Sequence, residues 1–272
     1  MKFHWMHRFD FGNSEKQLIE MSKALEKSKA YSVLLTYSVW SPDFVPFLPS
    51  MIRETKNLKF MMAFRPYTLS PEYAIRFFNT MKLNFGDRLT LNIVAGKMQE
   101  KEEKETLEMY NLDESSIDNI DKRIEYADKW AEKFFGTMKS KAPISYTIAN
   151  APSTIDLANK WTDYAIVSPG KLEEHSRKAT NTKLVLCIDP LIRETKEELD
   201  SEIEYYYQSW STNKGERPSK FAKQEHHIVG NMEKVKQQIT DISQKYGVND
   251  FLIVTSQKDI SSLLQLMEEM SS

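Results

Sequence analysis

Apolar and polar positions alternate along this chain with two different periods. Short runs rich in β-branched and apolar residues recur eight times, and most are followed by a stretch whose apolar residues repeat at helical spacing. Several runs, such as LTLNIV and KLVLCI, are apolar on both faces, which is typical of parallel strands buried on both sides. The expected strands are 2–6, 32–36, 58–64, 89–94, 144–148, 164–167, 183–188 and 250–255.

Capping residues mark the helices between these runs. Ser14, with Gln17 three positions later, predicts a capping box at the start of one helix. Pro71 stands in the first turn of another helix, and Gly86 stands at its end. Eight strand–helix units in 272 residues predict an α/β protein: a (β/α)8 TIM barrel with a single domain, 1–272.

Two polar stretches interrupt the alternation. Residues 97–117 are charged and poor in apolar side chains, and residues 210–230 are polar, with Gly215 and Pro218 among them. Long connections at the C-terminal ends of barrel strands usually carry the active site. We therefore expect both stretches to be loops at the mouth of the barrel.

Composition and hydropathy argue against nucleic acids and membranes as partners of this protein. Lys and Arg number 37 against 39 Asp and Glu, and they are spread along the chain, which predicts no nucleic-acid partner. No apolar run approaches the roughly 18 residues that span a bilayer. The first residues also lack the apolar core of a signal peptide. We expect no membrane association and a cytoplasmic location.

No metal site is predicted. The neighbouring His226 and His227 point to opposite sides of an extended chain, so they make a poor ligand pair. The sequence contains no CxxC, HExxH, Walker or GxSxG motif. The single cysteine, Cys187, excludes a disulfide within the chain, and its place inside a strand predicts a small core residue.

A series of motifs carries a family resemblance. KFMMAFRPYTLSPEYAIRFFNTM is followed by DRLTLNIVAG, and later by YTIANAPSTIDLANKWTDYAIV, CIDPLIRETKEEL and IVGNMEKVKQQITDISQKYGVNDFLIVT. Together they resemble the luciferase-like flavin-dependent monooxygenase superfamily, and they are most similar to its alkanesulfonate monooxygenase branch. The matching positions in the first two segments are Arg65, Pro66, Ser70, Pro71, Asn92, Val94 and Gly96.

The resemblance implies an enzyme that holds reduced FMN at the mouth of the barrel and uses O2 on a small organic substrate. It also implies a flavin reductase as partner, a homo-oligomer and, in some branches, a deazaflavin in place of FMN. Cys187 and Asp189 stand where the alkanesulfonate branch has an Arg and a His, so the substrate groups of that branch do not transfer. The alternative is a flavin-binding accessory protein of the same fold without oxygenase activity.

Three strand residues are candidates for contact with the flavin ring. Arg65 can bind the flavin or an anionic substrate group through bidentate hydrogen bonds, or form an ion pair beneath the site. Asn92 can hydrogen-bond the ring edge or a structural partner, because a buried amide needs one. Trp5 can lie against the ring, although an aromatic residue in a strand is more often part of the core.

The flavin phosphate is expected at the start of the helix after the fifth strand. Asn150, Ala151, Ser153 and Thr154 can offer backbone N–H groups and hydroxyls to an anion there. The Gly-Gly-Ser-type turn of the family is absent, and the missing glycines restrict how closely the backbone approaches a phosphate. Ser153 can instead be the N-cap of this helix.

Four more residues near strand ends are candidates for chemistry, because this fold places chemistry at the mouth. His7 is a candidate catalytic residue and Arg8 a candidate substrate contact, or both are rim residues tied to a neighbouring loop. Tyr37, after the second strand, is a candidate substrate contact. Asp189, after the seventh strand, can act as a general base or can cap a loop beside Pro190.

Overall fold

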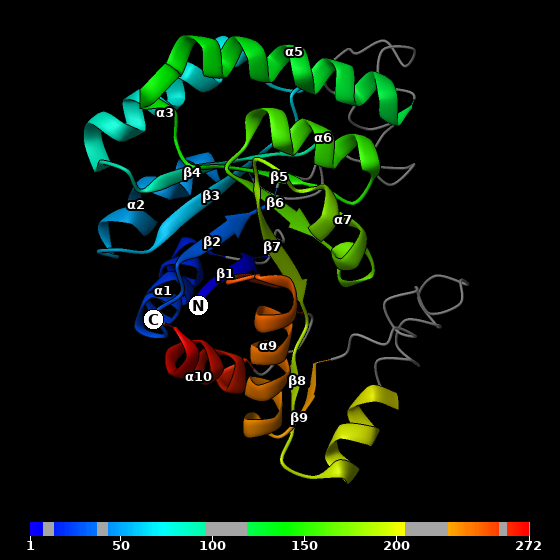
Figure 1. Ribbon diagram of the computed structural model, residues 1–272. Helices are drawn as coiled ribbons and strands as arrows, with labels where there is room; N and C mark the ends of the chain where they lie inside the picture. Colours follow the sequence, from blue (N-terminus) through cyan, green and yellow to red (C-terminus); the bar gives the residue numbers. More distant parts are fainter. Residues whose placement is uncertain (8–13, 37–42, 96–118, 205–227, 256–259, 272) are drawn as a thin grey trace.

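Eight parallel strands close into a barrel in the computed structural model (Figure 1), which describes residues 1–7, 14–36, 43–95, 119–204, 228–255 and 260–271. The barrel strands are β1 Lys2–His7, β2 Ser32–Leu35, β3 Lys59–Phe64, β4 Leu89–Ile93, β5 Ser145–Ile148, β6 Tyr164–Val167, β7 Lys183–Ile188 and β10 Asp250–Ile253. Their order around the barrel is β1-β10-β7-β6-β5-β4-β3-β2. Helices surround the strands, so the predicted (β/α)8 fold is confirmed.

The helices lie on the outside of the barrel (Figure 1). They are α1 Glu15–Lys27, α2 Leu48–Arg53, α3 Pro71–Phe85, α5 Ile120–Met138, α6 Pro152–Trp161, α7 Leu172–Lys178, α9 Met232–Tyr246 and α10 Ser261–Met270; residues 196–204 are also helical. Short 3₁₀ turns are η1 Val45–Phe47, η3 Lys139–Lys141 and η4 Pro169–Lys171. The predicted capping box is present, since the Ser14 hydroxyl accepts from the Gln17 N–H at 3.3 Å and the Gln17 side chain accepts from the Ser14 N–H at 2.8 Å.

Side chains alternate between two apolar cores, because successive residues of a strand point to opposite faces. The inner core fills the barrel and consists of Leu34, Met61, Ala63, Tyr146, Ile166, Val185 and Leu252. The outer core joins the other face of the strands to the helices; Phe3, Phe60 and Phe251 are among its fully buried members. This alternation decides which residues of each strand can reach a ligand inside the barrel.

A long excursion leaves the barrel after β7. Its base is a two-stranded parallel pair, β8 Leu191–Ile192 and β9 Val229–Gly230, in which Leu191 is the partner of Val229. Gly230 has φ 142°, and a Cβ atom at this position would lie 2.7 Å from the Lys234 Cδ, so only glycine fits without strain. The excursion over residues 193–228 therefore begins and ends at one fixed point.

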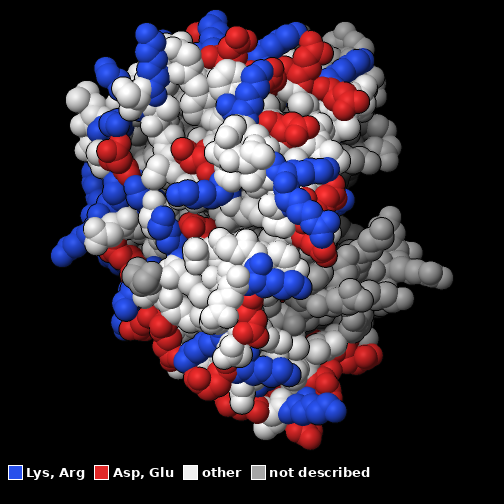
Figure 2. Space-filling model, in the orientation of Figure 1, with Lys and Arg blue, Asp and Glu red and all other residues white. Residues whose placement is uncertain are grey.

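Every predicted strand is present, with bounds that differ from the prediction by at most two residues. The β8–β9 pair was not predicted, because strands of two residues have no period to read. The expected mouth loop 97–117 lies outside the described residues, as does most of the second loop, 210–230. No described helix is long and apolar enough to cross a membrane. Basic and acidic side chains are interspersed over the face shown in Figure 2.

Candidate active site

Parallel strands bring their C-terminal ends together at one end of the barrel, and the predicted site residues follow those ends. His7 ends β1, Arg65 directly follows β3, Asn150 lies two residues after β5, and Asp189 directly follows β7. The fold thus places these backbone positions around one opening. Two further predicted residues, Arg8 and Tyr37, lie outside the described residues.

Asn92 lies next to the last residue of β4, with its side chain in the barrel interior. Its backbone register partners are Ala63 on β3 and Tyr146 on β5, which belong to the inner core. The side chain is fully buried, yet neither its Nδ2 nor its Oδ1 has a hydrogen-bond partner among the described residues. A buried amide without partners costs about 1–3 kcal/mol, and a polar ligand that reached Asn92 would recover part of this cost.

Arg65 is a buried cation close to Asn92. It follows β3, is 8% exposed, and its Nη1 donates a hydrogen bond of 3.0 Å to the Tyr67 hydroxyl. The Arg65 carbonyl in turn accepts a hydrogen bond of 2.9 Å from the Thr68 N–H, which fixes the turn after the strand. The guanidinium is therefore positioned by local contacts within the polypeptide.

Trp5 lies on the opposite face of its strand. It is 3% exposed and belongs to the outer core between the strands and the helices, together with Phe3. Its β1 neighbour His4 faces the inside of the barrel. The position of Trp5 therefore agrees with the alternative of a core aromatic, because its indole is turned away from the interior.

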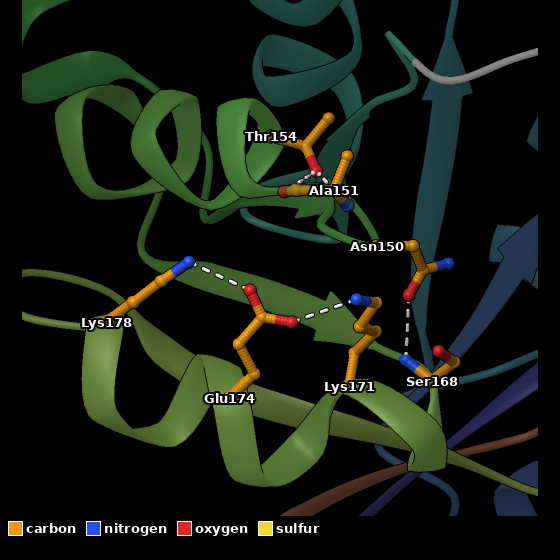
Figure 3. A network of polar contacts seen from close by, with 7 residues as sticks. All are labelled: Asn150, Ala151, Thr154, Ser168, Lys171, Glu174 and Lys178. Carbon is orange, nitrogen blue, oxygen red and sulfur yellow. Dashed lines mark hydrogen bonds and ion pairs between the residues drawn. The ribbon is translucent and has the colours of Figure 1, made fainter.

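The polar groups at the start of α6 form hydrogen bonds with one another. Ala151 is the N-cap, so the alternative that Ser153 caps this helix is wrong. The Thr154 hydroxyl accepts from the Ala151 N–H at 3.0 Å and donates to the Ala151 carbonyl at 2.7 Å (Figure 3). The Thr154 N–H also points to this carbonyl at 3.1 Å, and Pro152 has no N–H to offer. Few donors remain here for a phosphate.

The turns after β5 and β6 are tied together by side chains. The Asn150 Oδ1 accepts from the Ser168 N–H at 2.9 Å, as Figure 3 shows. Below it, the Glu174 carboxylate bridges Lys178 at 2.8 Å and Lys171 at 2.9 Å. These bonds, first that to Lys178 and then that to Lys171, lower the pKa of Glu174 to about 2. The Lys171 ammonium is therefore already paired with a carboxylate.

Ser153 borders an acidic groove of about 430 Å³ between α5 and α6. The carboxylates that line this groove belong to Asp121, Glu125, Asp128 and Asp156. Lys160 also lines the groove, but its ammonium is paired with Asp128 at 2.8 Å, so carboxylates predominate. A predominantly acidic lining is unfavourable for an anion and opposes the dipole of the helix start. The start of α6 therefore does not fit the phosphate that the sequence assigned to Asn150, Ala151, Ser153 and Thr154.

Two residues of the seventh strand segment differ in character. Asp189 is exposed and directly follows β7, so its carboxylate is accessible. Burial raises the pKa of the Cys187 thiol to about 12, so this group stays protonated and is a poor nucleophile at neutral pH. Cys187 is partly buried and packs against the inner core, which agrees with the predicted core role.

The sequence did not single out a polar chain inside the barrel: Ser32, His4 and Asp250. The His4 Nδ1 lies 2.7 Å from the Ser32 Oγ, and its Nε2 lies 3.4 Å from the Asp250 Oδ1. Residue types match a hydrolytic triad, but Ser32 and Asp250 are the first residues of β2 and β10, so the group lies away from the C-terminal mouth, where this fold places chemistry. These three hydrogen-bonded side chains form a structural network. Their spacing along the sequence matches no motif from which the network could be predicted. Among the described residues no group of three or more His, Cys, Asp or Glu side chains could hold a metal ion.

Comparison with known proteins defines the class of fold. No protein-family model matches the chain, and no curated protein sequence matches it. Solved structures do match, and they have the barrel of the luciferase-like monooxygenases, which confirms the fold that the resemblance implied.

Three solved structures illustrate the likeness. A long-chain alkane monooxygenase (LadA) has a TM-score of 0.74 and 12% identity over 98% of this chain and 90% of its own. A riboflavin lyase (RcaE), solved with modified FMN and riboflavin, has a TM-score of 0.76 and 11% identity over 97% of this chain and 89% of its own. The oxygenating constituent of 3,6-diketocamphane monooxygenase from Pseudomonas putida, in complex with FMN, has a TM-score of 0.67 and 14% identity over 98% of this chain and 96% of its own. At these identities the likeness shows the fold alone.

Proposed function

We propose that this protein is a flavin-dependent monooxygenase or oxidoreductase that uses reduced FMN and O2 on a small organic substrate. The fold supports this proposal, because the similar solved structures include monooxygenases and one complex with FMN. The observation that carries it is the unpartnered Asn92 amide, buried near the C-terminal end of β4.

The chemistry of Asn92 fits the edge of a flavin ring. The pyrimidine edge of isoalloxazine presents an N–H between two carbonyl oxygens, and a primary amide offers both an acceptor and donors. In our proposal Asn92 binds this edge, and Arg65 contributes a fixed positive charge beside it. When bound, the reduced flavin supplies the electrons that activate O2.

The roles of the remaining residues follow from their places. Asp189, exposed at the end of β7, is proposed to accept or return a proton during the reaction, and His7 at the end of β1 is proposed to assist catalysis. Arg8 and Tyr37 are proposed to contact the substrate. We assign no flavin contact to Trp5, which faces the outer core, and no phosphate contact to the start of α6.

The proposal extends to partners. A separate reductase is proposed to supply reduced flavin, and the protein is proposed to act as a homo-oligomer in the cytoplasm. FMN is proposed over a deazaflavin, although one similar structure is a coenzyme F420-dependent tetrahydromethanopterin reductase from Methanopyrus kandleri, with a TM-score of 0.67 and 14% identity over 98% of this chain and 97% of its own.

The second candidate is a flavin-binding accessory protein without oxygenase activity. What favours it is the seventh strand segment: Cys187 and Asp189 stand where the nearest family branch has its substrate-binding Arg and His. The engaged start of α6 bears on both candidates alike. Both candidates require the Asn92 contact, and they differ only in the chemistry after flavin binding.

An anaerobic titration with reduced FMN tests both candidates. We expect saturable binding at micromolar concentrations, weakened at least about tenfold in Asn92→Leu, which loses both amide hydrogen bonds. A parallel titration with reduced deazaflavin distinguishes the two cofactors. Absence of binding to either flavin contradicts the proposal.

Mixing the flavin complex with O2 separates the two candidates. An oxygenase incorporates one atom of ¹⁸O2 into a product when a small-molecule panel is added, and mass spectrometry detects that atom. Binding of reduced flavin without incorporation for any member of the panel favours the accessory protein. Ser168→Ala, directly after β6, is the matched control for Asn92→Leu. It changes a side chain near the mouth but keeps the Ser168 N–H that donates to Asn150.

A further inference from the structure

Five side chains gather at the N-terminal end of the barrel, opposite the candidate active site. They are Lys2, Tyr31, Lys59, Tyr164 and Lys183, which we call the lysine–tyrosine belt. The Lys2 Nζ lies 4.8 Å from the centre of the Tyr31 ring and 5.9 Å from that of Tyr164. The Lys59 Nζ lies 5.7 Å from the Tyr31 ring, and the Lys183 Nζ lies 6.0 Å from the Tyr164 ring. Three ammonium groups therefore surround two aromatic rings.

The belt has an excess of positive charge. Among the described residues no carboxylate forms an ion pair with Lys2, Lys59 or Lys183; Lys59 donates instead to the Asp87 carbonyl at 3.0 Å. Burial lowers the pKa of Lys59, and the charges of Arg88 and Lys2 lower it further against the opposite effect of Asp87. Two carboxylates lie near the belt: Asp250, the register partner of Lys2, accepts from His4, and Asp163 accepts from Ser145. Asp87 pairs with Lys82, so the three belt ammonium groups outnumber the two remaining carboxylates.

A buried hydroxyl faces the belt from inside the barrel. The Tyr146 ring stacks on the Tyr164 ring at 4.9 Å, and the side chain is fully buried. Its hydroxyl has no hydrogen-bond partner among the described residues. Burial raises the pKa of Tyr146, and Tyr31, Tyr164 and Asp250 raise it further. A donor without an acceptor thus lies behind the belt.

A pocket of about 350 Å³ opens beside the belt at Lys2 and Tyr31. It is also lined by Met1, Lys29 and Asn57. This volume far exceeds the ~10–15 Å³ that one water needs, so a small ligand has room to enter. Glu26 also lines the pocket, and its carboxylate accepts three backbone N–H groups. The Lys2 and Lys29 ammonium groups outnumber this carboxylate, so the wall is positive on balance.

We propose that the lysine–tyrosine belt binds a small polyoxyanion, inorganic phosphate or a phosphate monoester, at a site separate from the mouth of the barrel. The anion offsets the mutual repulsion of the three ammonium groups and accepts hydrogen bonds from them. The site does not depend on flavin binding, because every residue involved lies at the opposite ends of the strands from the candidate active site.

Calorimetric titration at constant ionic strength tests the proposal, with chloride replacing the added anion as reference. We expect one saturable site for inorganic phosphate, and a parallel titration with glycerol 3-phosphate shows whether a monoester also enters. In the double variant Lys2→Met, Lys59→Met we expect affinity at least about tenfold lower. Lys245→Met is the matched control, because the Lys245 Nζ also lies over a tyrosine ring, Tyr246 at 5.0 Å, but on α9.

Two further measurements keep the result unambiguous. Saturating reduced riboflavin, which carries no phosphate, should leave phosphate binding unchanged, since competition would place the anion at the mouth instead. If the double variant does not fold, Lys183→Met replaces it, because the Lys183 side chain is exposed and its loss should leave the fold intact. Phosphate binding that is absent in the wild type, or equal in wild type and belt variants, overturns the proposal.

Discussion

Asn92 on β4 and Tyr146 on β5 are register partners, and each carries into the barrel interior a polar group that no described residue satisfies. Both belong to the interior of the barrel, where Ala63 and Ile166 are among the apolar neighbours. Two unsatisfied groups at adjacent positions lower the stability of the free protein. In the proposals above, a flavin uses the Asn92 amide, while the Tyr146 ring stacks on Tyr164 of the lysine–tyrosine belt.

The first prediction is that replacing Asn92 makes the flavin-free protein more stable but weakens flavin binding. Asn92→Leu should raise the free energy of unfolding of the flavin-free protein by about 1 kcal/mol, because it removes an unpaired buried amide of similar size. The same change should weaken reduced FMN at least about tenfold. Denaturant unfolding and anaerobic titration measure the two effects.

Thr90→Val is the control for this exchange. Thr90 lies on the same strand and, two residues earlier, on the same face, and its hydroxyl is also buried without a partner among the described residues. We expect stabilisation of similar sign and unchanged flavin affinity. If Asn92→Leu and Thr90→Val affect flavin alike, Asn92 has no special role in binding.

A second prediction concerns the start of α6. Thr154→Val removes both hydrogen bonds to Ala151 and should lower the free energy of unfolding by about 1 kcal/mol, as for the loss of a helix cap. The affinity for FMN should stay unchanged, and Ser153→Ala should alter neither quantity. A loss of FMN affinity relative to riboflavin in either variant would restore the phosphate site to this helix start.

A third prediction is a loss of stability in mild acid that depends on His4. Burial lowers the pKa of His4 below its ordinary value of 6.5, although the hydrogen bond to Asp250 acts in the opposite direction. The unfolded chain therefore binds a proton before the folded protein does, and stability falls as the pH drops below 6.5 toward the lower, folded pKa. Above 6.5 this contribution is constant.

His4→Gln tests the origin of that dependence. Glutamine retains hydrogen-bonding groups but does not titrate, so the slope of the free energy of unfolding between pH 6.5 and 5 should become smaller in this variant. The His4→Gln variant can be less stable than the wild type at both pH values, because only the two slopes are compared. An unchanged slope would mean that His4 is not the group that titrates.

A fourth prediction concerns the joint between α1 and β3. One Glu26 carboxylate oxygen accepts the N–H groups of Lys56, Asn57 and Leu58 at 2.7, 2.5 and 3.1 Å. Glu26→Ala should lower the free energy of unfolding by about 1–2 kcal/mol, because three donors lose a charged acceptor. Glu20→Ala on the same helix, whose side chain is exposed, should cost under about 0.5 kcal/mol.

Acid titration gives an independent measure of Glu26. Burial raises its pKa, but the three N–H groups and Arg88 outweigh this effect, so the pKa lies below its ordinary value of 4.5. The stabilisation is complete above pH 4.5 and is lost as the pH falls through the lower, folded pKa. Wild type and Glu26→Ala should therefore converge in stability at strongly acidic pH.

The barrel could be predicted from the sequence because each of its strands is a buried run with clear ends. Strands such as β6 and β7 match the expected residues 164–167 and 183–188, since both faces are covered by apolar neighbours. The helix ends at Ser14 and Gly86 could also be predicted, because capping depends on residues only a few positions apart in the sequence. The β8–β9 pair depends on a contact between residues far apart in the sequence, which no local pattern reveals.

The candidate site was less predictable, because its chemistry depends on direction and on partners. The period of a strand puts Trp5 and His4 on opposite faces. Which of the two faces lines the interior becomes clear only from the closed barrel. The engagement of Thr154 with Ala151 and the acidic groove beside Ser153 depend on how helices pack. His4, Ser32 and Asp250 come from three strands spread over the whole chain, so only the folded structure brings them together.

The β8–β9 pair has a consequence for how such a protein can diversify. Because Leu191 and Val229 hold the two ends of the excursion together, residues can be inserted or deleted between them without moving a barrel strand. Doubling the length of a flexible connection costs only about 0.6 kcal/mol of closure entropy. Changes of length between these two residues should therefore leave the barrel strands in place, and Gly230 is the position at which that freedom ends.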